Sequence, residues 1–142
     1  MMDIPAWSDF FALGHDAIDS SHRDIMLGLA RVQAAVRAHD YRRAEQWVEA
    51  LSDACSIHAQ SEDETFVGFD HDFPHETFDE LLMRLRAGVC NRDTPERLFA
   101  AIHALEQALL SDIHADRSEM ARLAEGSPWR RSRRRWLSTL PA

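Results

Sequence analysis

The sequence predicts an all-α fold, an up-down-up-down antiparallel four-helix bundle with an N-terminal arm and a short basic C-terminal tail. Four segments repeat apolar residues at alternating steps of four and three, and short turn sequences separate them. No segment alternates apolar and polar residues as a half-buried strand does. With 142 residues, 45% of them hydrophobic, the chain is long enough for one domain with a substantial core. We expect the bundle over residues 1–126 and the tail over residues 127–142.

The first helix is expected to start near Ile18, after an apolar arm that runs through Gly14. The large apolar side chains of the arm are Trp7, Phe10, Phe11 and Leu13. The inward stripe of the helix consists of Ile18, His22, Ile25, Leu29, Val32 and Val36. Because the arm is too apolar for a free segment, we expect it to pack along the bundle. His22 is therefore a polar residue at a position that is expected to face the core.

The second and third helices carry polar residues in their stripes. After a turn at His39–Asp40, the second stripe consists of Ala44, Val48, Leu51, Cys55, His58 and Glu62. Gly68 marks the expected end of this helix. The third helix has Asp70 as an expected N-cap and Pro74 in its first turn, where a missing N–H is tolerated. Its stripe consists of His71, His75, Phe78, Leu82, Leu85 and Val89.

The fourth helix begins with the sequence Asp-Thr-Pro-Glu at residues 93–96, an N-cap signal followed by proline. Its stripe consists of Leu98, Ile102, Leu105, Leu109 and Ile113. His114 and Glu119 lie beside this stripe, although His114 shares a face with Leu110, four residues earlier. Asp116, two residues after His114, is expected to point elsewhere on the helix.

The charge is unevenly distributed along the chain. The net charge of −8 combines 24 acidic residues with 16 basic ones, all arginine, and five arginines fall within residues 130–135. An acidic body repels nucleic acid, so we expect no nucleic-acid partner. Trp129 and Trp136 flank the arginines of the tail. The tail is therefore interpreted either as a solvated or folded-back segment, or as an amphipathic anchor for acidic lipid or a partner protein.

The sequence also bears on the cellular compartment. No segment approaches the roughly 20 apolar residues of a membrane span, and no basic region precedes an apolar stretch at the N-terminus as in a signal peptide. We therefore expect a cytoplasmic protein without a membrane span. Cys55 and Cys90 show no metal-binding spacing and are expected to be free thiols.

Metal binding would explain why so many polar residues occupy core positions. Burying one polar side chain without a partner costs about 1–3 kcal/mol by mutational data. His58 and Glu62 are four residues apart, as are His71 and His75, so each pair stacks on one helix face. In an antiparallel bundle such residues can meet in one layer. The expected ligands are His22, His58, Glu62, His71, His75, His114 and Glu119.

The types of these residues favour iron. Imidazole suits iron, zinc, copper and nickel, whereas carboxylates that can bridge favour a dinuclear site, and the set contains no cysteine. The other histidines, His15, His39 and His103, have no such companions and are expected to be surface or capping residues.

The motifs on these segments resemble the hemerythrin family, in particular its single-domain bacterial members, over about residues 7–124. The matching sequences are GHDAIDSSH at residues 14–22, HAQSE at 58–62, and HDFPH at 71–75 followed by Phe78. The fourth motif departs from the family pattern His-Ile-x-x-x-Asp, because His114 is followed by alanine and, five positions later, by Glu119.

The resemblance implies a centre of two iron ions (Fe²⁺/Fe³⁺) with an oxo or hydroxo bridge. One iron would be held by His71, His75 and His114, the other by His22 and His58, with Glu62 and Glu119 bridging. The implied lining of the oxygen pocket is Ile25, Phe66, Phe69, Phe78 and Leu110.

The resemblance further implies that the protein binds O2 reversibly as peroxide, for oxygen storage, delivery or scavenging, and is not an enzyme. One alternative is a sensor or interaction module that responds to oxygen, nitric oxide or redox state and signals through the bundle surface or the basic tail. Another is an iron-handling or peroxide-consuming protein.

Overall fold

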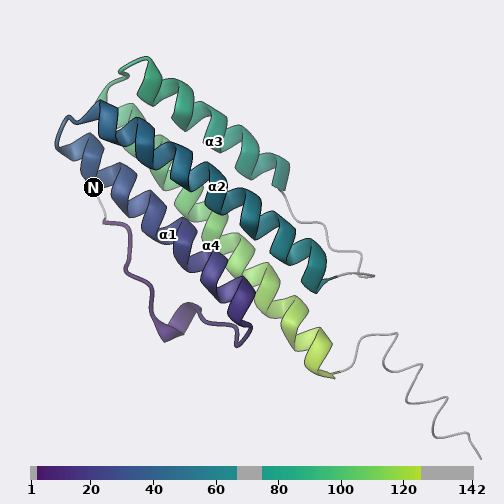
Figure 1. The fold of residues 1–142 in the computed structure, drawn as a ribbon. Coiled ribbons are helices and arrows are strands. Elements are labelled where there is room, and N and C mark those ends of the chain that lie inside the picture. Colours follow the sequence, from purple (N-terminus) through teal and green to yellow (C-terminus); the bar gives the residue numbers. More distant parts are fainter. Residues whose placement is uncertain (1–2, 67–74, 126–142) are drawn as a thin grey trace, which may run out of the picture.

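The computed structural model describes residues 3–66 and 75–125, with only the backbone at residues 75, 76 and 125. Most of these residues form four α-helices, and a short 3₁₀ turn precedes them. The elements are η1 (Asp9–Phe11), α1 (Asp16–Arg37), α2 (Tyr41–Thr65), α3 (His75–Cys90) and α4 (Pro95–Glu125). No strand occurs within residues 3–66 and 75–125. The prediction of an all-helical bundle is confirmed (Figure 1).

Each helix packs against two others, since α1 and α3 both contact α2 and α4. The stripe residues meet between the helices. The buried core includes Ile25, Leu29, Val32, Val36, Val48, Leu51, Leu85, Val89, Leu98, Ile102, Leu105 and Leu109. Gly28 allows α1 and α2 to approach closely, because a β-carbon there would lie 3.1 Å from Leu51 Cδ1.

Local signals define the helix ends that the sequence predicted. His39 adopts a left-handed conformation with φ of 55°, and Asp40 then caps α2 by accepting a hydrogen bond from Arg43 N at 3.1 Å. Pro95 is the first residue of α4, as expected. The Tyr41 hydroxyl donates to the carbonyl of Asp93 at 3.2 Å. The α1–α2 and α3–α4 connections therefore lie at the same end of the bundle.

The N-terminal arm packs along the bundle, as predicted. Ile4 is buried, and the side chains of Trp7, Phe11 and Leu13 pack against the core. Arg117 of α4 donates a hydrogen bond to the carbonyl of Phe10 at 2.7 Å. Polar and apolar contacts together hold the arm in place.

Histidines outside the expected ligand set behave as the sequence suggested. His15 is the N-cap of α1, where its side chain accepts a hydrogen bond from Ile18 N at 3.3 Å. His39 and His103 are exposed. Cys55 and Cys90 are free cysteines.

Several predictions fall outside the part of the chain that the structure describes. They concern Gly68, Phe69, Asp70, His71, Pro74 and the tail over residues 127–142. His75 is described only as the first residue of α3. Among the described helices, none is both long and apolar enough to cross a membrane.

Candidate metal centre

Five side chains that could bind a metal come together inside the bundle. They are His22 of α1, His58 and Glu62 of α2, and Asp112 and Asp116 of α4. Each offers one donor atom, and these five atoms all lie within 4.8 Å of one another. None of the five residues is more than 3% exposed. Three helices thus place two imidazoles and three carboxylates at one buried point.

Helical spacing explains how α2 and α4 supply two donors each. His58 and Glu62 are four residues apart, and so are Asp112 and Asp116. Side chains at this spacing lie one turn apart on the same helix face. His22 stands in the inward stripe of α1, which contacts both other helices.

Asp112 lies between the two imidazoles. Its Oδ2 atom is 2.5 Å from His58 Nε2 and 3.4 Å from His22 Nε2. On the two outer sides, Glu62 Oε1 is 2.7 Å from His58 Nε2, and Asp116 Oδ2 is 3.0 Å from His22 Nε2. The Nε2 atoms of both histidines therefore face carboxylate oxygens.

Burial and mutual contact shift the proton affinities of these groups. Burial, together with the neighbouring Asp116 and Asp112, raises the pKa of Glu62 far above its usual value. Burial also acts to raise the pKa of Asp112, but hydrogen bonds with His22, His58 and Glu62 outweigh it and hold the pKa of Asp112 below its usual value. Burial acts to lower the pKa of His22, yet its two aspartate partners outweigh this effect and raise it. Protons therefore offset part of the buried negative charge when no cation is bound.

Two properties of the donor set are consistent with a bound metal ion: it contains buried polar atoms without hydrogen-bond partners, and its side chains are of types that bind metals. His22 Nδ1 and Asp116 Oδ1 are buried, and neither has a hydrogen-bond partner within the described part of the chain. Unpartnered polar atoms are rare in protein interiors and call for an explanation. Imidazole nitrogen and carboxylate oxygen are ligands for iron, manganese and zinc. A cation would complete the coordination that the protein atoms leave open.

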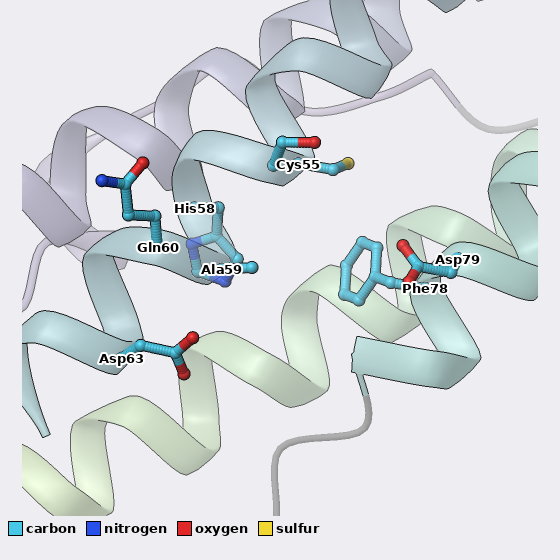
Figure 2. A pocket seen from close by; sticks show the side chains of 8 residues that line it. Cys55, His58, Ala59, Gln60, Asp63, Phe78 and Asp79 are labelled. Atoms are coloured by element: carbon cyan, nitrogen blue, oxygen red, sulfur yellow. The ribbon is translucent and has the colours of Figure 1, made fainter. Parts of the chain in front are cut away.

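A pocket of about 390 Å³ lies between α2 and α3 and reaches His58. Figure 2 shows His58 and Cys55 on the α2 side and Phe78 on the α3 side. Burial raises the pKa of the Cys55 thiol to about 12, with Asp79 and Asp112 adding to the effect. The thiol thus keeps its proton at neutral pH, so it is a poor metal ligand. Of the five cluster residues, His58 is the one that lines this pocket.

The structure gathers only some of the ligands expected from the sequence. His22, His58 and Glu62 belong to the cluster. His114 is exposed, and its carbonyl accepts a hydrogen bond from Ser118. Glu119 is buried but accepts a hydrogen bond from Arg122 Nη1 at 2.8 Å, and it is not one of the five donors. The expected ligands His71 and His75 have no described side chain.

Asp112 and Asp116 are the two donors that the sequence interpretation missed. The rhythm of steps of four and three, continued strictly from Leu105 and Leu109, reaches both aspartates. Ile113, the last residue of the predicted stripe, lies one residue after Asp112. Asp116 points to a different side of α4 from His114, as expected, but Asp116 is the residue that is fully buried in the cluster, whereas His114 is exposed.

The expected lining of an oxygen pocket is partly described. Ile25, Phe66 and Phe78 are buried, and Phe78 lines the pocket beside His58. Leu110 is half-buried and packs against the core. Of these residues, Phe78 shares a pocket with a member of the cluster, His58.

Comparison with known proteins reveals no relative: no family model, no curated protein and no solved structure matches the chain. Function is therefore inferred from the site itself.

Proposed function

We propose that this chain is a non-haem iron protein that binds O2 reversibly at a buried centre, for oxygen storage, delivery or scavenging. The observation that supports this proposal most strongly is the buried group of two imidazoles and three carboxylates within 4.8 Å of one another. Carboxylates buried together repel each other, and a bound cation offsets that repulsion. Ferrous iron held by these residues would supply the electrons that O2 binding requires.

The spacing of the described donors fits one ion. First-row metal ions bind nitrogen and oxygen ligands at about 2.0–2.2 Å, so donors on opposite sides of an ion are about 4.2 Å apart. The five donor atoms, within 4.8 Å of one another, need only a small inward movement to reach this distance. A second iron, as in the hemerythrin family that the sequence resembles, would require further donors. We assign that role to His71 and His75.

The protein's own residues contribute protection and orientation. The five donor residues are at most 3% exposed, and Phe78 lines the pocket beside His58, so the access of water to the cluster is limited. Exclusion of water and of stray reductants favours reversible binding over irreversible oxidation. Asp112 Oδ2 faces both imidazoles, whose ring centroids lie 4.6 Å apart.

The composition of the donor set favours iron handling or peroxide consumption as a second candidate function. Three of the five described donors are carboxylates, whereas the sequence predicted five histidines and two glutamates. Anionic oxygen ligands stabilise the higher charge of Fe³⁺ relative to Fe²⁺. A centre with this preference would oxidise readily and release O2 poorly.

Anaerobic reconstitution with Fe²⁺ tests the proposal and separates the two candidates. Iron per chain is counted, and the visible spectrum is recorded while O2 is admitted and removed. We expect two irons per chain and an absorption band that appears and disappears with O2. Irreversible oxidation with turnover of added peroxide would support the second candidate.

Two variants locate the iron. His58→Ala should lose at least one iron, and the control His103→Ala, at an exposed position of α4, should keep the wild-type content. Absence of iron from the wild-type protein, or full iron content in His58→Ala, would contradict both candidate functions.

A further inference from the structure

Ser21 connects helix α1 to a donor on helix α2. Its side chain is 3% exposed and precedes His22 in the sequence. The hydroxyl oxygen lies 2.9 Å from the carbonyl oxygen of Ile18 and 2.9 Å from His58 Nδ1. One buried hydroxyl group thus touches both its own helix backbone and an imidazole 37 residues away.

The directions of these two hydrogen bonds follow from the chemistry of the partners. The carbonyl oxygen of Ile18 can only accept, so the single hydroxyl hydrogen of Ser21 is donated to it, as helical serines commonly do. The hydrogen bond between Ser21 and His58 must therefore take its hydrogen from the imidazole ring. His58 Nδ1–H donates to Ser21 Oγ. This arrangement places a hydrogen on Nδ1 and directs Nε2 towards Glu62 and Asp112.

We propose that Ser21 is a positioning residue that fixes the Nδ1–H tautomer of His58 and thereby presents the Nε2 lone pair to a metal ion. The proposal rests on the proposed function, because it gives a role to Ser21 in a site that binds metal. Histidines that bind metals commonly donate their second ring N–H to a protein group, which fixes tautomer and ring orientation. Ser21 is the group that does so for His58.

The two histidines of the cluster differ in whether Nδ1 has a hydrogen-bond partner, and this difference provides an internal control. His22 Nδ1 has no hydrogen-bond partner in the part of the chain that the structure describes. Loss of the Ser21 hydroxyl should therefore disturb the ring of His58 and leave the tautomer of His22 unchanged. A general loosening of the bundle would affect both rings.

The first test is the protonation pattern of His58 in the wild-type protein. Histidine labelled with ¹⁵N is observed by NMR in the metal-free protein and after addition of Zn²⁺, a diamagnetic probe. We expect hydrogen on Nδ1 of His58 in both forms and a metal-induced shift at Nε2. If Nδ1 carries no hydrogen, the proposal is overturned, whether or not Zn²⁺ binds. If Zn²⁺ fails to bind while Nδ1 carries hydrogen, the proposed metal function fails instead, and the hydrogen bond from Nδ1 to Ser21 stands.

The second test compares serine variants by their affinity for Zn²⁺. Ser21→Ala should weaken binding by about 10- to 100-fold, the usual effect of removing a hydrogen-bond partner from a metal-binding histidine. Ser21→Thr keeps a hydroxyl at this position and should recover most of the affinity. Ser118→Ala is the matched control, because Ser118 donates to the carbonyl of His114 at 3.2 Å on the exposed side of α4. Wild-type affinity in Ser21→Ala, with Nδ1 of His58 still protonated in the same fraction, would overturn the proposal.

Discussion

The two ends of the bundle bury opposite kinds of side chain. Near the α1–α2 and α3–α4 connections, the core is formed largely by aliphatic residues; this apolar half includes Val32, Val36, Ala44, Val48, Leu51, Val89, Leu98 and Ile102. Towards the other end of α1, α2 and α4, the charged half holds His22, His58, Glu62, Asp112 and Asp116. Both halves are almost fully buried.

The difference shows which half can be stable by itself. Aliphatic burial stabilises a fold without any further partner. Three buried carboxylates do not, because they need protons or a cation to offset their charge. The apolar half thus supports a charged half whose stability depends on what it binds.

Truncating the core beside the charged half should give the largest loss of stability. Leu105 is 1% exposed, and Leu105→Ala should lower the free energy of unfolding by about 2–5 kcal/mol because it leaves a cavity. Urea denaturation of the metal-free protein measures the change. Leu27→Ala, at a residue that is 45% exposed, is the control and should change it by less than about 1 kcal/mol. Equal effects of the two variants would mean that Leu105 contributes no more to the core than a surface residue.

Removing one charge from the charged half should act on metal binding. Asp116→Asn should weaken Zn²⁺ binding by more than about 100-fold, since even indirect partners of metal ligands contribute 10- to 100-fold. Titration calorimetry provides the measurement. His114→Ala is the matched variant, since His114 is exposed and lies two residues away on the same helix; it should bind as the wild type does. Weakened binding in His114→Ala together with wild-type binding in Asp116→Asn would instead support the ligand set expected from the sequence.

Stability of the metal-free protein should fall as the pH rises from 5 to 8. The raised pKa of Glu62 means that the folded protein holds a proton which the unfolded chain releases above its usual pKa of 4.5. The raised pKa of His22 acts in the same direction. Its contribution to the free energy of unfolding is lost as the pH rises through the pKa of His22 in the folded protein. The lowered pKa of Asp112 also stabilises the fold, but this contribution does not change between pH 5 and pH 8 because the carboxyl group is ionised in both the folded and the unfolded state.

Thermal unfolding in the presence of a chelator measures this dependence. One proton held only by the folded state changes the free energy of unfolding by about 1.4 kcal/mol for each pH unit. Glu62→Gln should flatten the profile. A melting temperature that increases from pH 5 to pH 8 would contradict the assignment of a proton to Glu62.

Helix capping at the apolar end should have the smallest effect, and one that is independent of metal. Asp40 caps α2 through the amide of Arg43, so Asp40→Ala should lower the free energy of unfolding by about 1 kcal/mol. The decrease should be the same with and without Zn²⁺. Asp53→Ala, at an exposed position within α2, is the control. A metal-dependent effect of Asp40→Ala would show that the two halves are more tightly coupled than we infer.

The sequence predicted the fold better than the site, for physical reasons. Helical periodicity, the cap at Asp40 and the proline at the start of α4 are local signals, and the structure confirms them. His58 and Glu62 were found because they continue a regular stripe. The donors of α4 were missed because the broad buried face of this helix includes both Asp112 and Ile113.

On α4 the sequence predicted His114, which shares a face with Leu110, in place of Asp112. In the family pattern a histidine precedes an isoleucine, whereas here Asp112 precedes Ile113 and the histidine follows it. A shift of two residues turns a helical side chain by about 200°, which separates an inward aspartate from an outward histidine. Which residue points inward depends on packing between helices, and the residue types alone do not determine it.

The position of bound iron tests the central claim most directly. Crystals of the protein reconstituted with Fe²⁺ under anaerobic conditions would be measured at the iron absorption edge, so that anomalous scattering locates the metal. We predict a peak within about 2.5 Å of donor atoms from His58, Asp112 and Asp116. The absence of a peak at these residues, or a peak between His114 and Glu119 instead, would contradict the assignment of the buried cluster as the metal centre.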